Sequence, residues 1–292
     1  MKQAKQAKYD PRSDGDVPAG MSIEMLQDLH LLTRDGQLNA DARRKLKQIR
    51  HLVGLLKPAM DDALARSPEP LVIDCGAGKS YLGALLYELV LGPAGRGELL
   101  AIESRPELTA QAAARAARFG QSRFTAVASA IDAVTPAKRP SVVTALHACD
   151  TATDDALALA ITSDADHVAV VPCCQAEVAR QLERAHPRDA AVGALFEHPL
   201  HRRELGSHLT NVVRGLALAA NGYKVTVTEL VGWEHSAKNE LIVARRVNRF
   251  DAHARDQLRA VLAQFEIEPA IVRLLRAKHR DPTTEPPAAA SA

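Results

Sequence analysis

Few cysteines and little net charge mark this sequence, and each scarcity argues against a class of protein. The 292 residues include four cysteines, and no two of them have Cys-x-x-Cys spacing: Cys75, Cys149, Cys173 and Cys174. Reduced thiols in a cytoplasmic protein are therefore expected, rather than a secreted disulfide framework. The net charge of +2 mixes both signs, which argues against a histone-like nucleic-acid binder but permits a local basic face.

Long apolar runs are also missing. The first 20 residues carry positive charge without the apolar core of a secretory signal. No apolar run is long enough to cross a bilayer, so a soluble protein without membrane contact is expected. Apolar residues recur at helical spacing before position 68, and Pro and Ala dominate the last residues. The predicted division is a disordered N-terminus (1–20), a helical extension (21–68), a main domain (69–249), C-terminal helices (250–280) and a disordered tail (281–292).

The main domain alternates short apolar runs with helical patterns. The predicted strands are 71–75, 98–102, 124–128, 141–146 and 167–171, and the predicted helices are 80–91, 106–119, 152–162 and 174–185. Strands that are apolar throughout, joined by helical crossovers, indicate an α/β fold with a parallel sheet covered on both faces.

The last part of the domain has a different pattern. A helix near 205–220 is predicted to end at Asn221-Gly222, and two strands follow at 223–232 and 239–247. The link between them is too short for a parallel crossover, so the two strands are expected to pair antiparallel.

The loop after the first strand, in LVIDCGAGKSYLG, holds parts of two phosphate-binding motifs and completes neither. A P-loop needs a glycine five residues before Gly78, where the sequence has Ile73. The dinucleotide pattern Gly-x-Gly-x-x-Gly fits Gly76 and Gly78 but meets Tyr81 at its third glycine. Neither a nucleoside triphosphate nor NAD is therefore the favoured ligand.

An acid followed by Gly-x-Gly suits a ligand without phosphate. The two glycines let the backbone approach an uncharged ligand edge, and Asp74 can complement an ammonium group. S-adenosylmethionine (SAM) has an ammonium and no phosphate. Glu103 ends the second strand, near the place where nucleoside-binding folds keep a carboxylate for ribose hydroxyls. Alternatively, Glu103 only caps the next helix, which Pro106 would open.

Five motifs together resemble a bacterial family of class I SAM-dependent methyltransferases. They are DCGAGKSYLG (74–83), LHACD (146–150), PCCQ (172–175), LTNVVRGLALAANGY (209–223) and EHSAKNEL (234–241). That family is distantly similar to eukaryotic methyltransferase-like proteins and to the tRNA 2′-O-methyltransferase acting near the acceptor stem. The resemblance implies a Rossmann-like sheet, mostly parallel with the last strand antiparallel, preceded by a helical extension.

SAM is the implied cofactor. Its expected binding residues are Asp74, Gly76, Ala77, Gly78, Tyr81, Glu103, Ser104 and Leu146. This chain departs from the relatives at two places, since they often carry His at position 175 and Thr-Asp at 210–211, where this chain has Gln175 and Asn211. If either position transfers a proton in the family, the departures affect chemistry more than cofactor binding.

The expected catalytic residues follow the fourth and fifth strands and lie in the last loop. His147 can accept a proton near neutral pH; alternatively it bonds within a tight loop beside Asp150, the expected N-cap of the next helix. For Cys173 and Cys174, packing and pocket lining are favoured over a nucleophile for a pyrimidine C5. Zinc is least favoured, because adjacent cysteines point apart, and no metal is expected.

The loop before the last strand and a basic helix indicate the substrate. Lys238 and Asn239 can position a polar substrate, although both are also ordinary turn residues. The basic stripe at 43–50, with Arg34 and Lys57 nearby, can hold RNA phosphates or be a solvated face. Methyl transfer to an oxygen or nitrogen of RNA (tRNA or rRNA) is therefore predicted. The alternative is a non-catalytic module that retains the cofactor fold and binds RNA or a partner.

Overall fold

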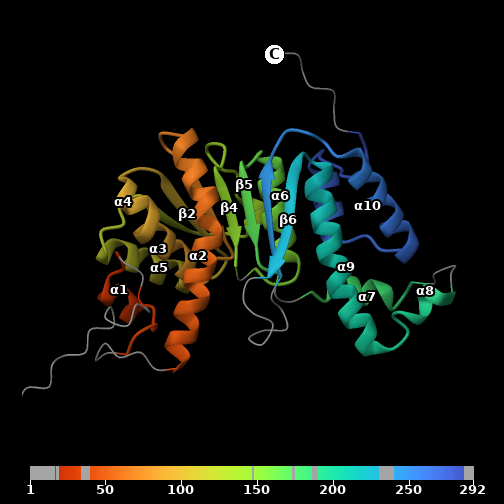
Figure 1. The fold of residues 1–292 in the computed structure, drawn as a ribbon, viewed down its shortest axis with the longest axis horizontal. Helices are drawn as coiled ribbons and strands as arrows, with labels where there is room; N and C mark the ends of the chain where they lie inside the picture. Colours follow the sequence, from red (N-terminus) through yellow and green to blue (C-terminus); the bar gives the residue numbers. More distant parts are fainter. Residues whose placement is uncertain are drawn as a thin grey trace, which may run out of the picture.

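A seven-stranded sheet forms the centre of the protein (Figure 1). The computed structural model describes residues 17, 20–33, 40–146, 148–172, 175–185, 190–229 and 240–285. The strands are β1 (Leu71–Cys75), β2 (Glu98–Glu103), β3 (Phe124–Ala128), β4 (Val142–Ala145), β5 (His167–Val170), β6 (Tyr223–Glu229) and β7 (Glu240–Arg246).

The strand order is β3-β2-β1-β4-β5-β7-β6. Strands β1 to β5 pair in parallel, and β7 pairs antiparallel with both β5 and β6. The predicted Rossmann-like sheet, mostly parallel with an antiparallel last strand, is confirmed. Because β7 lies between β5 and β6, β6 forms one edge of the sheet. The carboxyl ends of β1 to β5 meet at one edge, called the carboxyl edge below.

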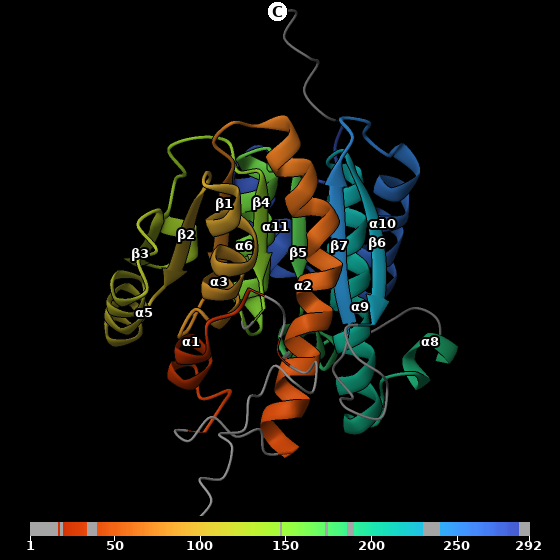
Figure 2. The same cartoon turned by 60° about the vertical axis from the view of Figure 1, so that its left-hand side comes forward.

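Helices cover both faces of the sheet (Figure 2). They are α1 (Ile23–Asp28), α2 (Ala40–Arg66), α3 (Tyr81–Leu86) with a π-helical continuation (Tyr87–Leu91), α4 (Gly92–Ala94), α5 (Pro106–Arg118), a 3-10 turn (Ile131–Ala133), α6 (Thr151–Thr162), α7 (Glu177–Leu182), α8 (Ala190–Ala194), α9 (Pro199–Ala220), α10 (Ala252–Phe265) and α11 (Ala270–Ala277).

The apolar strands fit this two-sided burial. In β1, Leu71, Ile73 and Cys75 pack on the side of α6, α9 and α11. Val72 points to the other side, where α2 and α3 lie. Alternate residues of a strand point to opposite faces, so a strand covered on both faces is mostly apolar on both sides, and Asp74 is the exception in β1.

Helix α2 crosses the face of the sheet and is tied to it near the start of β5. The Asp62 Oδ2 and His167 Nε2 atoms are 2.6 Å apart, and Arg66 donates to Asp62 as well. Leu52 and Leu56 of α2 are buried against the sheet. Helix α1 forms a separate buried cluster with α3, which includes Met25 and Leu85.

The start of one predicted helix differs from the structure. The helix predicted near 205–220 begins earlier, at Pro199, because proline fits the first turn and His198 caps it by accepting from the Leu200 N–H. It ends as predicted, with Asn221 as C-cap and Gly222 at φ +89°. The helical extension contains α1 and α2, and residues 34–39 between them lie outside the described part of the chain.

The two predicted disordered ends lie mostly outside the described residues. Within the predicted N-terminal segment, the side chain of Val17 is buried in the α1 cluster. Within the predicted tail, Asp281 pairs with Arg276 and accepts from Thr283. Among the described residues, no helix is both long and apolar enough to span a membrane.

Candidate cofactor-binding and active site

The glycine loop joins the carboxyl end of β1 to α3. Gly76 and Gly78 have φ of +61° and +57°, a conformation that other residues adopt with strain. A Cβ atom on Gly76 would lie 3.1 Å from the Cβ of Ala148, in the segment after β4. Gly76 is therefore required by the backbone and by close packing within the protein, in addition to the predicted approach of a ligand.

Gly83 performs the packing role that the sequence pattern assigned to position 81. A Cβ atom there would lie 2.4 Å from the Ser80 Oγ and 3.1 Å from a Leu99 methyl carbon. Its absence lets α3 lie close to the sheet, as the third glycine of a dinucleotide loop does. The sequence signal was present in Tyr-Leu-Gly, two residues beyond the standard spacing.

Asp74 lies beneath the glycine loop, and its residue is only 2% exposed. Its carboxylate accepts hydrogen bonds from the Ser80 hydroxyl at 3.3 Å, from the Thr144 hydroxyl at 3.4 Å, and from the backbone of Gly83. Burial raises the pKa of Asp74 to about 7, although these three bonds oppose the rise. The carboxylate holds the loop on the sheet; its contact with a cofactor ammonium stays a prediction.

Glu103, at the carboxyl end of β2, is bonded to the glycine loop. Its Oε2 accepts from the Gly78 N–H at 2.8 Å. Its Oε1 accepts from the Arg105 N–H at 3.1 Å and from the Arg105 Nε at 2.8 Å. Burial would raise the pKa of Glu103, but the bonds from Arg105 and Gly78 outweigh it and lower the pKa. Glu103 also accepts from the Ser104 hydroxyl and from the Arg105 Nη2, so it joins the loop to the start of α5, and its contact with a ribose stays a prediction.

The remaining predicted cofactor residues occupy different surroundings. Ala77 is buried, and its N–H donates to the Ile102 carbonyl at 3.0 Å. Tyr81 packs against the α1 cluster, and Leu146 packs partly against the α2 side of the sheet. Ser104 is exposed. The structure thus gathers Asp74, the glycine loop and Glu103, while Tyr81 turns toward α1.

All five predicted catalytic residues, His147, Cys173, Cys174, Lys238 and Asn239, lie outside the described residues. Their described neighbours are Leu146, Ala148, Pro172, Gln175 and Glu240, all at the carboxyl edge. Of the other two cysteines, Cys75 is buried and Cys149 is exposed. Within the described ranges, no group of three or more His, Cys, Asp or Glu residues could hold a metal ion.

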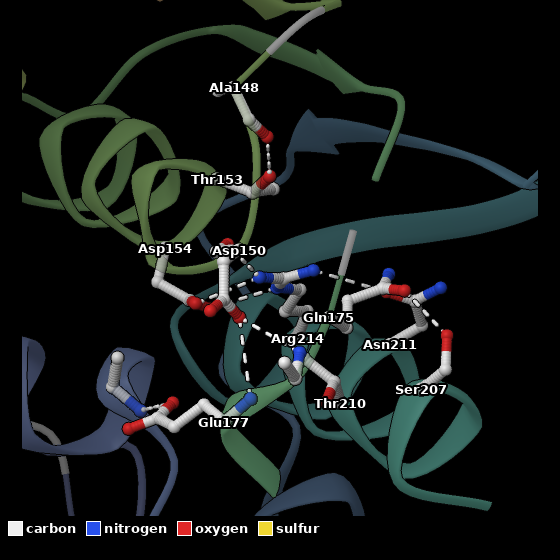
Figure 3. A network of polar contacts seen from close by, with 12 residues as sticks. Ala148, Asp150, Thr153, Asp154, Gln175, Glu177, Ser207, Thr210, Asn211 and Arg214 are labelled. Atoms are coloured by element: carbon white, nitrogen blue, oxygen red, sulfur yellow. Dashed lines mark hydrogen bonds and ion pairs between the residues drawn. The ribbon is translucent and has the colours of Figure 1, made fainter. Parts of the chain in front are cut away.

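A buried polar network lies beside these neighbours (Figure 3). Its centre is Arg214 on α9, whose side chain is 1% exposed. Arg214 donates to both carboxylate oxygens of Asp154 at 2.8 Å and to the Asp150 carbonyl at 2.8 Å. Burial raises the pKa of Asp154, and the Arg214 hydrogen bonds oppose the rise. This pair fixes α9 against the start of α6.

Gln175 and Asn211, the two positions expected to differ from the resembled family, contact each other. The Gln175 Nε2 donates to the Asn211 Oδ1 at 2.8 Å, and the Ser207 hydroxyl donates to the Gln175 Oε1 at 2.5 Å. Both Gln175 and Asn211 are buried. Gln175 and Asn211 therefore form a neutral amide pair at the exit of β5.

The prediction that Asp150 caps α6 is wrong in its chemistry. Asp150 occupies the N-cap position of α6, but its side chain makes no capping bond there. Its Oδ1 instead accepts from the Ala176 N–H at 3.1 Å and the Glu177 N–H at 3.4 Å, and its Oδ2 pairs with Arg180. The carboxylate satisfies the start of α7, which the fold places beside it.

A basic cavity of about 420 Å³ adjoins the glycine loop on the side of α1 and α5. Its charged lining includes Lys79, Arg115, Arg118 and Asp28, with His30 beside them. Arg115 and Arg118 both pair with Asp28, and Arg115 also donates to the Lys79 carbonyl. One carboxylate thus faces three basic side chains, which leaves a net positive charge.

Residues 44–181 match the model of a protein family described as a methyltransferase domain. Over these residues, just under half of its length, the chain is similar to a methyltransferase domain. The matched segment holds β1 to β5, the glycine loop and Glu103. The predicted enzyme class is confirmed at the level of this domain, whereas the predicted relationships to eukaryotic and tRNA-modifying proteins remain predictions. No curated protein matches the chain at a significant level.

Solved methyltransferase structures are distant from this domain. An rRNA methylase from Streptococcus thermophilus is 9% identical with a TM-score of 0.41, and the match covers 66% of this chain and 95% of that one. Magnesium protoporphyrin IX methyltransferase from Synechocystis PCC 6803, with bound SAM, is 12% identical with a TM-score of 0.43, covering 79% and 100%. A ribosomal protein L11 methylase from Lactobacillus delbrueckii is 14% identical with a TM-score of 0.37, covering 66% and 77%.

Proposed function

We propose that this protein is a SAM-dependent methyltransferase that transfers a methyl group to an oxygen or nitrogen atom of RNA. The observation that carries the proposal is the joined site at the carboxyl edge of the methyltransferase domain. There the Glu103 carboxylate is bonded to the Gly78 N–H, beside a buried Asp74. Ligands of open α/β sheets bind at this edge.

The donor set fits SAM. The lowered pKa of Glu103 keeps a carboxylate available for ribose hydroxyls, and Gly76 and Gly78 expose backbone without side chains. SAM supplies a methyl group on a sulfonium, which is already a good leaving group. The protein must align the acceptor and take up its proton. We assign the proton to His147, and substrate positioning to Lys238 and Asn239, with the Cys173–Cys174 pair lining the site.

Titration calorimetry tests the cofactor assignment. One molecule of SAM, or of its demethylated product, is expected to bind per chain, and NAD is not. In Glu103→Ala, loss of charge-assisted hydrogen bonds is expected to weaken binding by about 1.5–3 kcal/mol. Glu98→Ala is the matched control, since that carboxylate begins the same strand, is 52% exposed and pairs with Lys138. If wild type and Glu103→Ala bind SAM with equal affinity, Glu103 has only a structural role in holding the glycine loop.

The assignment of RNA rests on the basic cavity and on α2. Arg43 and Arg50 of the predicted basic stripe are exposed. Lys57 is paired with Asp61, which weakens its predicted phosphate role, and Arg34 lies outside the described residues. A comparison of modified nucleosides in RNA from cells with and without the gene tests the reaction. If the protein binds SAM but no modified nucleoside disappears from the RNA of cells without the gene, the non-catalytic alternative is favoured.

A second prediction concerns RNA binding at the basic cavity. If Lys79 contacts a phosphate, Lys79→Ala should weaken RNA binding and lower the slope of log affinity against log salt by about 0.7–0.9. Lys224→Ala, which removes an exposed lysine from the edge strand β6, should leave the slope unchanged. Filter binding over a range of salt concentrations measures both, and an unchanged slope for Lys79→Ala would remove the cavity from the RNA-binding surface.

A further inference from the structure

Arg115, on α5, is a buried cation that connects α1 to the glycine loop. Its side chain is 7% exposed and lies where α1 packs beside α3 and α5 (Figure 1, Figure 2). Its Nε donates to the Asp28 carboxylate at 2.6 Å, and its Nη1 donates to the Lys79 carbonyl at 2.5 Å. One guanidinium therefore holds both the last residue of α1 and the middle of the glycine loop.

Lys79 lies between two residues that hold the predicted cofactor site together. The preceding residue, Gly78, donates its N–H to Glu103 at 2.8 Å, and the following residue, Ser80, donates its hydroxyl to Asp74 at 3.3 Å. Gly78 and Ser80 have φ of +57° and +50°. Because Ser80 carries a Cβ atom, this left-handed conformation is strained, and the buried surroundings of Ser80 must hold it.

Hydrogen bonds fix both ends of the peptide group between Lys79 and Ser80. Its N–H donates to the Ala77 carbonyl at 2.7 Å, which closes a tight turn, and its C=O accepts from Arg115. Rotation of this peptide group would break both bonds and disturb the adjoining bond from Gly78 to Glu103. A bond from a charged donor is stronger than one from a neutral donor, so Arg115 opposes that rotation.

We propose that Arg115 is a positioning residue for the cofactor, which holds the glycine loop in its binding conformation through the Lys79 carbonyl. This rests on the proposed methyltransferase function, because that function makes the loop a SAM site. A loop that already has its bound conformation loses less freedom when the ligand binds, so the ligand binds more tightly. The residue acts on SAM through the loop and needs no contact with it.

Chemical rescue tests this role. In Arg115→Ala, titration calorimetry is expected to show a SAM affinity about tenfold lower than in wild type, the effect of one charge-assisted hydrogen bond. The truncation opens the basic cavity, which Arg115 lines, to a small cation. Guanidinium chloride at a non-denaturing concentration should restore most of the affinity, because the free ion can donate to the Asp28 carboxylate and the Lys79 carbonyl. Sodium chloride at the same ionic strength should not.

Arg123→Ala is the matched control. Arg123 also donates to two backbone carbonyls, those of Gly97 at 2.9 Å and Leu91 at 2.8 Å, and neither belongs to the glycine loop. Its loss is expected to lower the melting temperature without changing SAM affinity. If Arg115→Ala does not fold, Arg115→Met keeps the apolar stem, removes the same two bonds and should show the same loss of affinity.

Hydrogen exchange measures the loop without a ligand. The Gly78 and Ser80 N–H groups are bonded in wild type and should exchange about tenfold faster in Arg115→Ala, but at the wild-type rate in Arg123→Ala. If wild type itself binds no SAM, the proposed function is refuted, and these exchange rates decide whether Arg115 holds the loop.

Three results would overturn the proposal once SAM binding by wild type is established. The first is wild-type SAM affinity in a folded Arg115→Ala or Arg115→Met variant. The second is an equal loss of affinity in Arg123→Ala, which would make the effect one of general stability. The third is a loss of affinity in Arg115→Ala that guanidinium leaves unchanged.

Discussion

Replacing Asp154 with alanine is expected to lower the free energy of unfolding by about 3–5 kcal/mol. The substitution leaves the Arg214 guanidinium, whose side chain is 1% exposed, without its bidentate partner. Arginine cannot lose its proton inside a protein, so a charge would remain buried with only the Asp150 carbonyl and Asn211 to accept from it. Urea denaturation of wild type and variant measures the loss.

The control for this prediction is an exposed ion pair. Asp61→Ala breaks the contact with Lys57, where the side chains are 56% and 65% exposed, and should cost no more than about 1 kcal/mol. The double variant Asp154→Leu/Arg214→Met should be more stable than Asp154→Ala, because both buried charges are gone. A cost for Asp154→Ala no larger than that for Asp61→Ala would contradict the prediction.

A second large effect is expected from the pH dependence of Asp74. Burial raises its pKa in the folded protein to about 7, from 3.8 in an unfolded chain. The folded state therefore holds a proton that the unfolded state has lost between these two values. The resulting stabilisation is present at low pH and is lost as pH rises from about 4 to about 7, by about 4 kcal/mol in total.

Asp74→Asn isolates this contribution. The variant has no proton to lose at this position, while all other groups titrate as in wild type. Its unfolding free energy relative to wild type should therefore rise by about 4 kcal/mol between pH 4 and pH 8. Urea denaturation at several pH values measures the difference. A difference that stays constant with pH would show that the folded-state pKa of Asp74 is ordinary.

The same ionisation can test the predicted ammonium contact. If the SAM ammonium approaches Asp74, the bound state favours the carboxylate, and cofactor affinity should increase as pH rises toward 7. The hydrogen bonds from Ser80, Thr144 and Gly83 already favour the ionised form. Affinity that does not change with pH would leave Asp74 as a support of the loop alone.

Much of the fold could be predicted because both sheet faces are buried. That burial makes the central strands predominantly apolar, with Asp74 as the exception in β1, and makes the crossovers periodic helices. The antiparallel pairing of β6 and β7 followed from their short link. The insertion of β7 between β5 and β6 did not, because local patterns carry no information on which neighbour a strand selects.

The site was only partly predictable, because local sequence patterns do not show which elements pack against each other. The motif around Gly76 and Gly78 is local, so the sequence located the loop, and Glu103 followed from strand order. The bond between Glu103 and Gly78 and the packing role of Gly83 depend on how closely β1, β2 and α3 approach one another. Sequence spacing does not determine that distance.

Period, motif and chain order are local properties, so they were sufficient to predict the parallel sheet, the position of the glycine loop and the acid at the end of β2. Only the tertiary structure decided that Asp150 caps α7 rather than α6, and that Gln175 and Asn211 form one pair. The partners in these contacts lie 26 and 36 residues apart. A polar side chain bonds to whatever unsatisfied group the fold brings within reach, and that group need not be its neighbour in the chain.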